Sequence, residues 1–157
     1  MIKERFRDYA TAAFIDYFKL GQPTRSQHEE RIRREIYRAY PLSSQETRDR
    51  KSLEAIDRSK PLLDDIDAVN IVFDILGGAK YDGVYMPVDV TKNGADIADA
   101  IRYVYCGLHR EKPSYSRIAG RVRRYSTDKY VSERNVYRWL KIGIRLFAIV
   151  RGLYHED

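Results

Sequence analysis

The chain has 157 residues, 43% of them hydrophobic and 33% charged, with a formal net charge of +6 at pH 7. Its length fits one domain, or one domain with a small appendage, and its composition is that of a protein able to bury a core. The single cysteine, Cys106, excludes an internal disulfide and multi-cysteine zinc sites, and no apolar run reaches transmembrane length. Since the first residues lack the apolar stretch of a signal peptide, we expect a cytoplasmic protein without membrane contact.

Helices are expected throughout the first half of the chain, because apolar residues recur there at helical spacing. They cover residues 2–20, 26–40, about 43–59 and about 61–76. The second and third helices begin with the spacing of a capping box, Ser26 with Glu29 and Ser43 with Glu46. The fourth ends at Gly77 and Gly78, which can adopt the left-handed conformation of a helix C-terminus. The fold class expected from this pattern is an all-α helical bundle.

The second helix carries a cluster of arginines that invites a nucleic-acid interpretation. Its members are Arg31, Arg33, Arg34 and Arg38. Glutamates interleave with them, and the pairs Glu29–Arg33 and Glu30–Arg34 have i,i+4 spacing. We therefore interpret this part as a self-paired, solvated face.

Residues 79–94 form the least helical stretch. They contain the turn-forming pairs Asp82-Gly83 and Asn93-Gly94, with Pro87 between them. We expect a long loop or a small hairpin here, with Asn93 as the cap of a following helix. This stretch divides the chain into a helical N-terminal part, residues 1–94, for oligomerisation or partner binding, and a DNA-binding unit, residues 95–157.

The last third of the chain is basic and has the layout of a helix-turn-helix. From Ala95 onward there are 13 Lys plus Arg against 7 Asp plus Glu, whereas residues 1–94 are neutral. Residues 114–152 read as a short basic helix, a connection and a longer helix whose N-cap is Ser132. A basic patch that coincides with a helix pair is typical of a nucleic-acid binder, so we expect double-stranded DNA as the partner.

The side chains expected to contact DNA fall into two groups. Bases in the major groove would be contacted by residues that lie off the apolar stripe of the second helix: Arg134, Asn135, Arg138 and Lys141. Phosphates would be held by Arg117, Arg121, Arg123, Arg124, Tyr125, Lys129 and Tyr130. Arginine and asparagine are suited to the first role because they can read guanine and adenine edges, whereas phosphate contacts only set the register.

The second half of the last helix is apolar on nearly all sides. From Ile142 to Leu153 its apolar residues run around most of the helix instead of forming one stripe. Such a helix must be buried on nearly all sides, either by the aromatic stripe of residues 6–18 or by a second subunit. We favour a homodimer over a monomer, because a DNA-binding protein with two-fold symmetry doubles its contacts to a palindromic site.

These residues resemble a known family. Residues 100–105 (Ala-Ile-Arg-Tyr-Val-Tyr), 115–119 (Tyr-Ser-Arg-Ile-Ala) and 131–139 (Val-Ser-Glu-Arg-Asn-Val-Tyr-Arg-Trp) resemble phage late transcription regulators of the ArpU and RinA type. Their DNA-binding part is similar to the helix-turn-helix of sigma-factor region four. Residues 63–69 look like the helix that precedes this unit. The resemblance implies activation of phage or prophage late genes, with RNA polymerase as a candidate partner.

The chain departs from that family in two respects. The stretch of residues 79–94 looks inserted relative to the family's usual shape, and the spacing within the helix-turn-helix is long. Ala119 and Val136, the small residue of the first helix and the first core residue of the second, are 17 positions apart, which is longer than in a compact helix-turn-helix. The extra residues, 123–130, either lengthen the first helix or make a loop.

No pattern for catalysis or for a cofactor is recognisable. The chain has no phosphate-binding glycine loop and no His-Glu-x-x-His motif, and its three histidines are far apart in the sequence. We therefore expect no enzyme, no metal and no cofactor. Two other functions remain as alternatives to a regulator. One is a DNA-packaging or assembly protein similar to a small terminase subunit, and the other is a helical protein-interaction module whose arginines meet an acidic partner.

Overall fold

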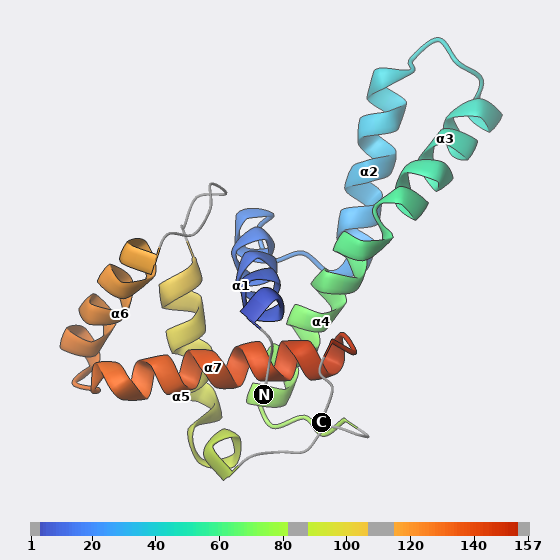
Figure 1. The fold of residues 1–157 in the computed structure, drawn as a ribbon. Coiled ribbons are helices and arrows are strands. Elements are labelled where there is room, and N and C mark those ends of the chain that lie inside the picture. The colour runs from blue at the N-terminus through green and yellow to red at the C-terminus, as the bar shows by residue number, and fades with distance from the viewer. Residues whose placement is uncertain (1–3, 82–87, 107–114, 154–157) are drawn as a thin grey trace. The chain divides into compact units, whose positions relative to one another are not determined.

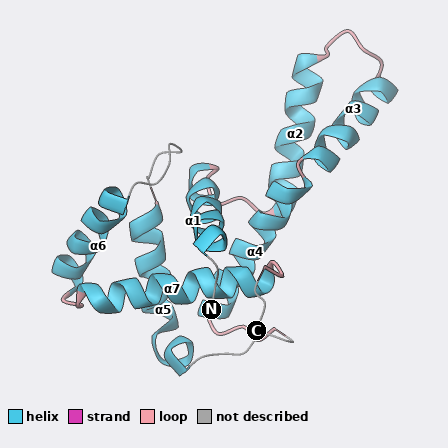
Figure 2. Cartoon of the chain, in the orientation of Figure 1, coloured by secondary structure: helices cyan, strands magenta, loops and turns pink. Residues whose placement is uncertain are grey.

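The structure, a computed structural model, describes residues 4–81, 88–106 and 115–153 (Figure 1). Within these ranges every regular element is a helix, and there is no strand (Figure 2). The helices are α1 (Glu4–Lys19), α2 (Arg25–Ala39), α3 (Gln45–Arg58), α4 (Lys60–Leu76), α5 (Val88–Tyr105), α6 (Tyr115–Lys129) and α7 (Glu133–Val150). The all-α class is therefore confirmed. None of these described helices combines the length and the apolar character that crossing a membrane requires.

The caps of α2 and α3 lie close to their expected positions but on other residues. Thr24, and not Ser26, caps α2: its hydroxyl accepts from the Gln27 backbone N–H at 3.2 Å, and the Gln27 side chain accepts from the Thr24 N–H at 2.9 Å. Ser44, and not Ser43, caps α3. A capping box needs a partner three residues after the cap, and Gln27 serves Thr24 as a glutamate would.

The expected loop or hairpin over residues 79–94 is wrong for residues 88–94, which belong to α5. Residues 82–87 lie outside the described residues. The first turns of α5 are held by Val90, whose side chain is buried in the core together with those of Ile97 and Val104. Ile97 and Val104 are seven residues apart, a spacing that returns to the same helix face.

A kink interrupts α5 where the sequence predicted a helix cap. Asn93 has a φ of −124° and a ψ of 20°, outside the helical range. The adjacent Gly94 is buried, and a Cβ at its position would lie 2.2 Å from the Leu76 carbonyl oxygen. Glycine is therefore required at this position, because any side chain would displace the backbone at the end of α4.

The chain divides into two compact units. The larger one contains Met1–Gln22 and Ala68–Asp157, and the smaller one contains Pro23–Asp67. This division differs from the expected one after residue 94, because α1 and the second part of α4 belong with the C-terminal helices.

In the larger unit, α1 packs against both α5 and α7. Phe14 of α1 is fully buried, and its ring centroid lies 5.8 Å from that of Phe147 and 5.7 Å from that of Tyr105. Leu146 is buried as well. The aromatic stripe of α1 thus covers the apolar half of α7, which was one of the two expected arrangements. Since this cover comes from the same chain, the apolar surface of α7 no longer gives a reason to expect a dimer.

The smaller unit is a pair of helices, α2 and α3, followed by the first part of α4. Arg25, at the start of α2, holds the unit together through three carboxylates. Its guanidinium lies 2.8 Å from Asp67, 3.0 Å from Asp64 and 3.3 Å from Glu29. A network of this kind is stronger than an isolated surface pair, which contributes roughly 0–1 kcal/mol.

Tyr105 makes the stability of the larger unit sensitive to alkaline pH. Burial raises its pKa to about 12, although a hydrogen bond with Thr11 opposes the shift. Because the folded-state pKa lies above the usual value of 10.0, the contribution to stability is complete below pH 10 and is lost as the pH rises towards 12.

We therefore expect Tyr105→Phe to lose less stability than the parent protein between neutral pH and about pH 11. The difference should be on the order of 1–2 kcal/mol, and denaturant unfolding at both pH values measures it. Tyr130→Phe, which changes an exposed tyrosine, is the control. Identical alkaline losses in Tyr105→Phe and in the parent would show that Tyr105 is not the titrating group.

Candidate nucleic-acid interface

Helices α6 and α7 are joined by only three residues, 130–132. The residues that exceed the spacing of a compact helix-turn-helix therefore lengthen α6, which continues to Lys129, and do not form a loop. Ser132 caps α7 as expected, since its hydroxyl accepts from the Asn135 backbone N–H at 3.1 Å. Both helices pack against α5 (Figure 1).

The turn between the two helices places a tyrosine where glycine is usual. Tyr130 has a φ of +55°, in the left-handed region, and its side chain is 97% exposed. The Val131 N–H donates to the Ser126 carbonyl at 3.2 Å, and the Ser126 hydroxyl donates to the Val131 carbonyl. This is the hydrogen-bond pattern that commonly ends helices at a left-handed residue. A non-glycine residue in this conformation stores strain, which is a feature found often at functional sites.

All four residues expected to contact bases lie together at the start of α7. Arg134, Asn135, Arg138 and Lys141 line one open hollow of about 640 Å³. Three of them are exposed, and Asn135 is half-buried. From Arg134 to Lys141 the helix rises roughly 10 Å, which corresponds to about three base pairs. The size of this basic stretch suits a helix that reads a short run of bases.

Tyr137 also lines this hollow, although the sequence interpretation did not select it. It follows Arg134 by three residues, so the helical spacing that placed Arg134 and Arg138 on one face also places Tyr137 there. Tyrosine combines an apolar ring with a hydroxyl that can donate to phosphate.

The opposite face of α7 fixes its orientation. Val136, Trp139, Leu140 and Gly143 are buried. A Cβ on Gly143 would lie 2.4 Å from Cδ1 of Ile101, so the absence of a side chain lets α7 approach α5 closely. The hollow is therefore carried by a helix whose rotation is set by the core, as a rigid binding site requires.

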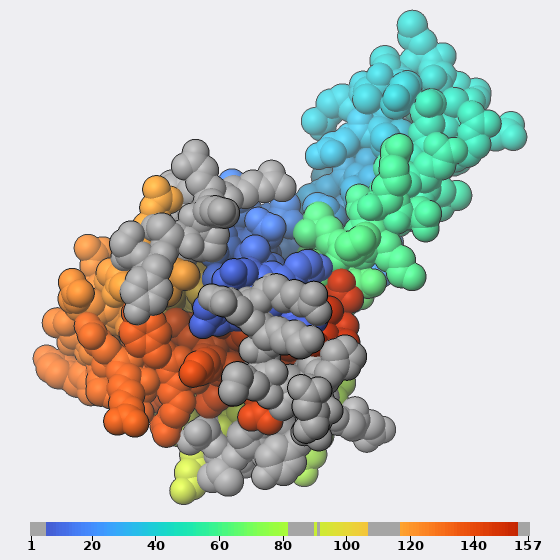
Figure 3. All heavy atoms as spheres, in the orientation of Figure 1, coloured from blue at the N-terminus to red at the C-terminus, as the bar shows by residue number. Residues whose placement is uncertain are grey.

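Most of the expected phosphate contacts are exposed. They are Arg117, Arg123, Arg124, Lys129 and Tyr130. Arg123 pairs with Glu133 at 3.5 Å, but both side chains are at least half exposed. Such a pair contributes at most about 1 kcal/mol, so a phosphate can replace the carboxylate at small cost. Figure 3 shows the atoms of α6 and of the first part of α7, in orange, on one face of the larger unit.

Arg121 and Tyr125 were expected to hold phosphates, but the structure assigns them to the packing of α6 on α5. The Arg121 guanidinium donates to the carbonyls of Tyr103 and Val104 at 3.0 and 2.9 Å and lies over the Tyr103 ring. Tyr125 is buried, and its hydroxyl donates to Asp99 at 3.0 Å. The Arg121 guanidinium supplies donors to carbonyls near the end of α5, which have no partner within the helix. The buried Tyr125 hydroxyl has its partner in Asp99, as buried hydroxyls require.

The side chains that line this surface are mainly cations and hydrogen-bond donors. Within the described ranges, no three His, Cys, Asp or Glu side chains come together as ligands of a metal ion. Comparison of the chain with models of protein families, with curated proteins and with solved structures found no match. The function is therefore inferred from the residues of the chain itself.

Replacing Tyr130 by glycine should separate stability from binding. Glycine relieves the left-handed strain but increases the entropy of the unfolded chain, so the free energy of unfolding should stay the same or rise by up to about 1 kcal/mol. The affinity for duplex DNA should fall, because an exposed donor is lost. Denaturant unfolding and DNA titration of the same variant measure both quantities. A clear loss of stability would show that the tyrosine serves the fold, and Tyr130→Phe tests the hydroxyl alone.

Proposed function

We propose that the chain is a sequence-specific, double-stranded-DNA-binding transcriptional regulator that places the start of α7 in the major groove. The observation that carries this proposal is the hollow lined by Arg134, Asn135, Arg138 and Lys141. These side chains can donate to guanine and adenine edges, and they project from the first turns of a helix that follows a short turn.

The arrangement around α7 supports a helix-turn-helix mode of docking. In such readers the first helix of the pair crosses the DNA backbone while the second enters the groove. Helix α6 would take the first role, because Arg117, Arg123, Arg124 and Lys129 are exposed on it. Helix α5, which packs against both, would hold the pair at a fixed angle.

The resemblance to phage late transcription regulators extends the proposal to its biological setting. The regulated genes would be late genes of a phage or prophage, and RNA polymerase would be the partner that the regulator engages at a promoter. The protein would then act in the cytoplasm, where both partners are found.

The salt dependence of binding to a random duplex tests the proposal. The four exposed cations of α6 alone, placed on phosphates, predict that log K falls against log salt with a slope of roughly −4 or steeper. Fluorescence anisotropy with a labelled duplex, at several salt concentrations from about 50 mM upward, measures this slope. Absence of binding at the lowest salt concentration would contradict the proposal, because non-specific electrostatic binding is strongest there.

A further inference from the structure

Helix α2 is unusual for a helix of a folded unit, because none of its residues is buried. Helix α3 buries only Ser52. Most of α2 is therefore available to solvent or to a partner, and its charge decides which kind of partner fits.

The arginines of α2 are less neutralised than the sequence spacing predicted. Glu29 does not pair with Arg33, because it lies 3.3 Å from Arg25. Arg33 and Arg34 instead share one carboxylate, that of Glu30, each at 3.8 Å. These distances are near the outer limit of an ion pair. Of the two expected pairs, Glu30–Arg34 is therefore present, whereas Glu29–Arg33 is replaced by Glu29–Arg25 and Glu30–Arg33.

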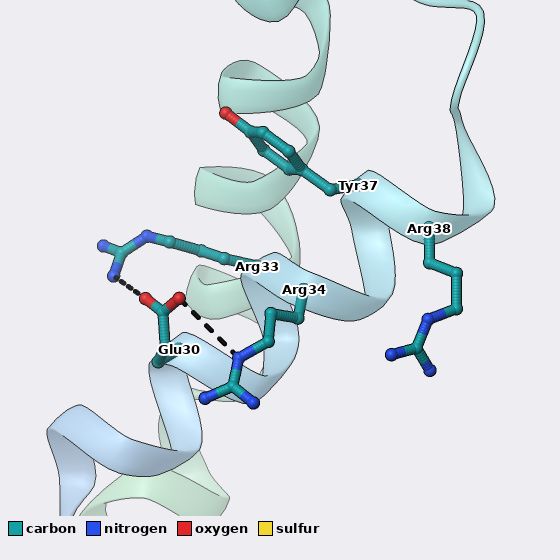
Figure 4. Close-up of a pocket in the computed structure, with 5 residues that line it drawn as sticks. All are labelled: Glu30, Arg33, Arg34, Tyr37 and Arg38. Carbon is teal, nitrogen blue, oxygen red and sulfur yellow. Dashed lines mark ion pairs between the residues drawn. The ribbon is translucent and has the colours of Figure 1, made fainter.

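A third arginine adds to the excess of positive charge. Arg38 is exposed and has no acidic partner in the part of the chain that the structure describes. Figure 4 shows both Arg33 and Arg34 linked to Glu30, whereas Arg38 stands apart, one turn beyond Arg34. The side chains drawn in Figure 4 thus include three arginines and one glutamate.

These side chains surround an open hollow of about 370 Å³. Its lining consists of Glu30, Arg33, Arg34, Tyr37 and Arg38. Helix α3 fixes the tyrosine, because Asp49 accepts a hydrogen bond from the Tyr37 hydroxyl and the Arg48 guanidinium lies 4.7 Å from the ring centroid. Asp49 keeps its negative charge beside the hollow, but it forms no ion pair with the described arginines of the lining. The arginines consequently stand around a rigid aromatic residue.

We propose that this α2 face is a second, sequence-independent binding surface for the phosphates of duplex DNA. Guanidinium groups bind phosphate oxygens in bidentate fashion, and interfaces with DNA are more polar and more positively charged than those with proteins. A protein partner would instead require an apolar centre, and the lining of this hollow contains no aliphatic side chain. The surface extends the DNA-binding function proposed above and rests on it.

The double variant R34Q/R38Q of the full chain tests this surface against a random duplex. Two lost phosphate contacts should reduce the magnitude of the slope of log K against log salt by roughly 2. The base preference, measured by competition between duplexes of different sequence, should stay the same. The control R50Q/R58Q removes the same charge from exposed positions of α3 outside the hollow and should leave the slope nearly unchanged.

The possible results separate the two proposals. An unchanged slope in R34Q/R38Q, with normal binding by the parent protein, would overturn the α2 surface alone and would favour an acidic protein as the partner of these arginines. An equal reduction of the slope in R34Q/R38Q and in the control would also overturn it, because such a reduction would reflect only the total charge of the protein. Absence of duplex binding by the parent protein would overturn both proposals. Circular dichroism verifies that the variants remain folded.

Discussion

Replacing Arg134 and Arg138 by alanine is expected to abolish most of the preference of this protein for its own DNA site. Both side chains line the hollow at the start of α7, and both are exposed. Each lost base contact should cost roughly 1–3 kcal/mol, or about 5- to 150-fold in affinity for the preferred duplex. Affinity for unrelated duplexes should change far less, so the ratio of the two affinities is the quantity to measure.

Arg123→Ala is the matched control for these substitutions. Arg123 is an exposed arginine of α6, and its partner Glu133 holds it only weakly, at 3.5 Å. Loss of a phosphate contact should weaken all duplexes alike and leave the ratio unchanged. If the α7 variants instead behave like Arg123→Ala, then α7 contacts only the DNA backbone, and its assignment to the groove is wrong.

Replacing Phe14 by alanine is expected to have the largest effect on stability. Phe14 is fully buried, and its ring contacts the rings of Phe73, Tyr105 and Phe147. Deleting a buried phenylalanine ring typically costs about 3–5 kcal/mol, through lost burial and the cavity left behind. Denaturant unfolding with an unchanged m-value would measure this loss. An effect of that size would be a large fraction of the stability of a domain of this size.

The same variant also tests whether α1 covers α7 within one chain. Leu53→Ala in α3 is the control, because that side chain is 62% exposed and should change the stability by less than about 0.5 kcal/mol. A loss for Phe14→Ala no greater than that of the control would mean that α1 does not cover α7. Light scattering after size exclusion would then show whether a second subunit provides the cover.

The sequence predicted the helices well because their signals are local. Apolar stripes lie within the helices that they define, and the expected stop follows directly: α4 ends at Leu76, two residues before Gly78, whose φ is +107°. The caps were misplaced by one or two residues, because Thr24–Gln27 and Ser26–Glu29 present the same spacing. Residues 88–94 were assigned to a loop or hairpin because Asn93-Gly94 is a turn signal. In the structure, α5 begins at Val88, before this pair, and Val90 is buried.

The candidate site was predictable where it depends on one helix and was not where it depends on distant residues. Arg134, Asn135, Arg138 and Lys141 share a face because of helical spacing alone. Arg121 is held by carbonyls 17 and 18 residues away, and Tyr125 by a carboxylate 26 residues away. Similarly, Glu29 joins Arg25, which also binds Asp64 and Asp67 about 40 residues further along. Counting charges along the sequence does not show which residues pair over such long separations.

Selection of bound sequences from a random duplex pool tests sequence-specific DNA binding most directly. The purified full-length chain is incubated with the pool, and the bound fraction is sequenced after several rounds. We predict enrichment of a common motif, with guanines or adenines at the positions that α7 contacts, and loss of that motif with the Arg134→Ala and Arg138→Ala variants. A bound pool whose base composition matches the input would contradict sequence-specific recognition by this protein.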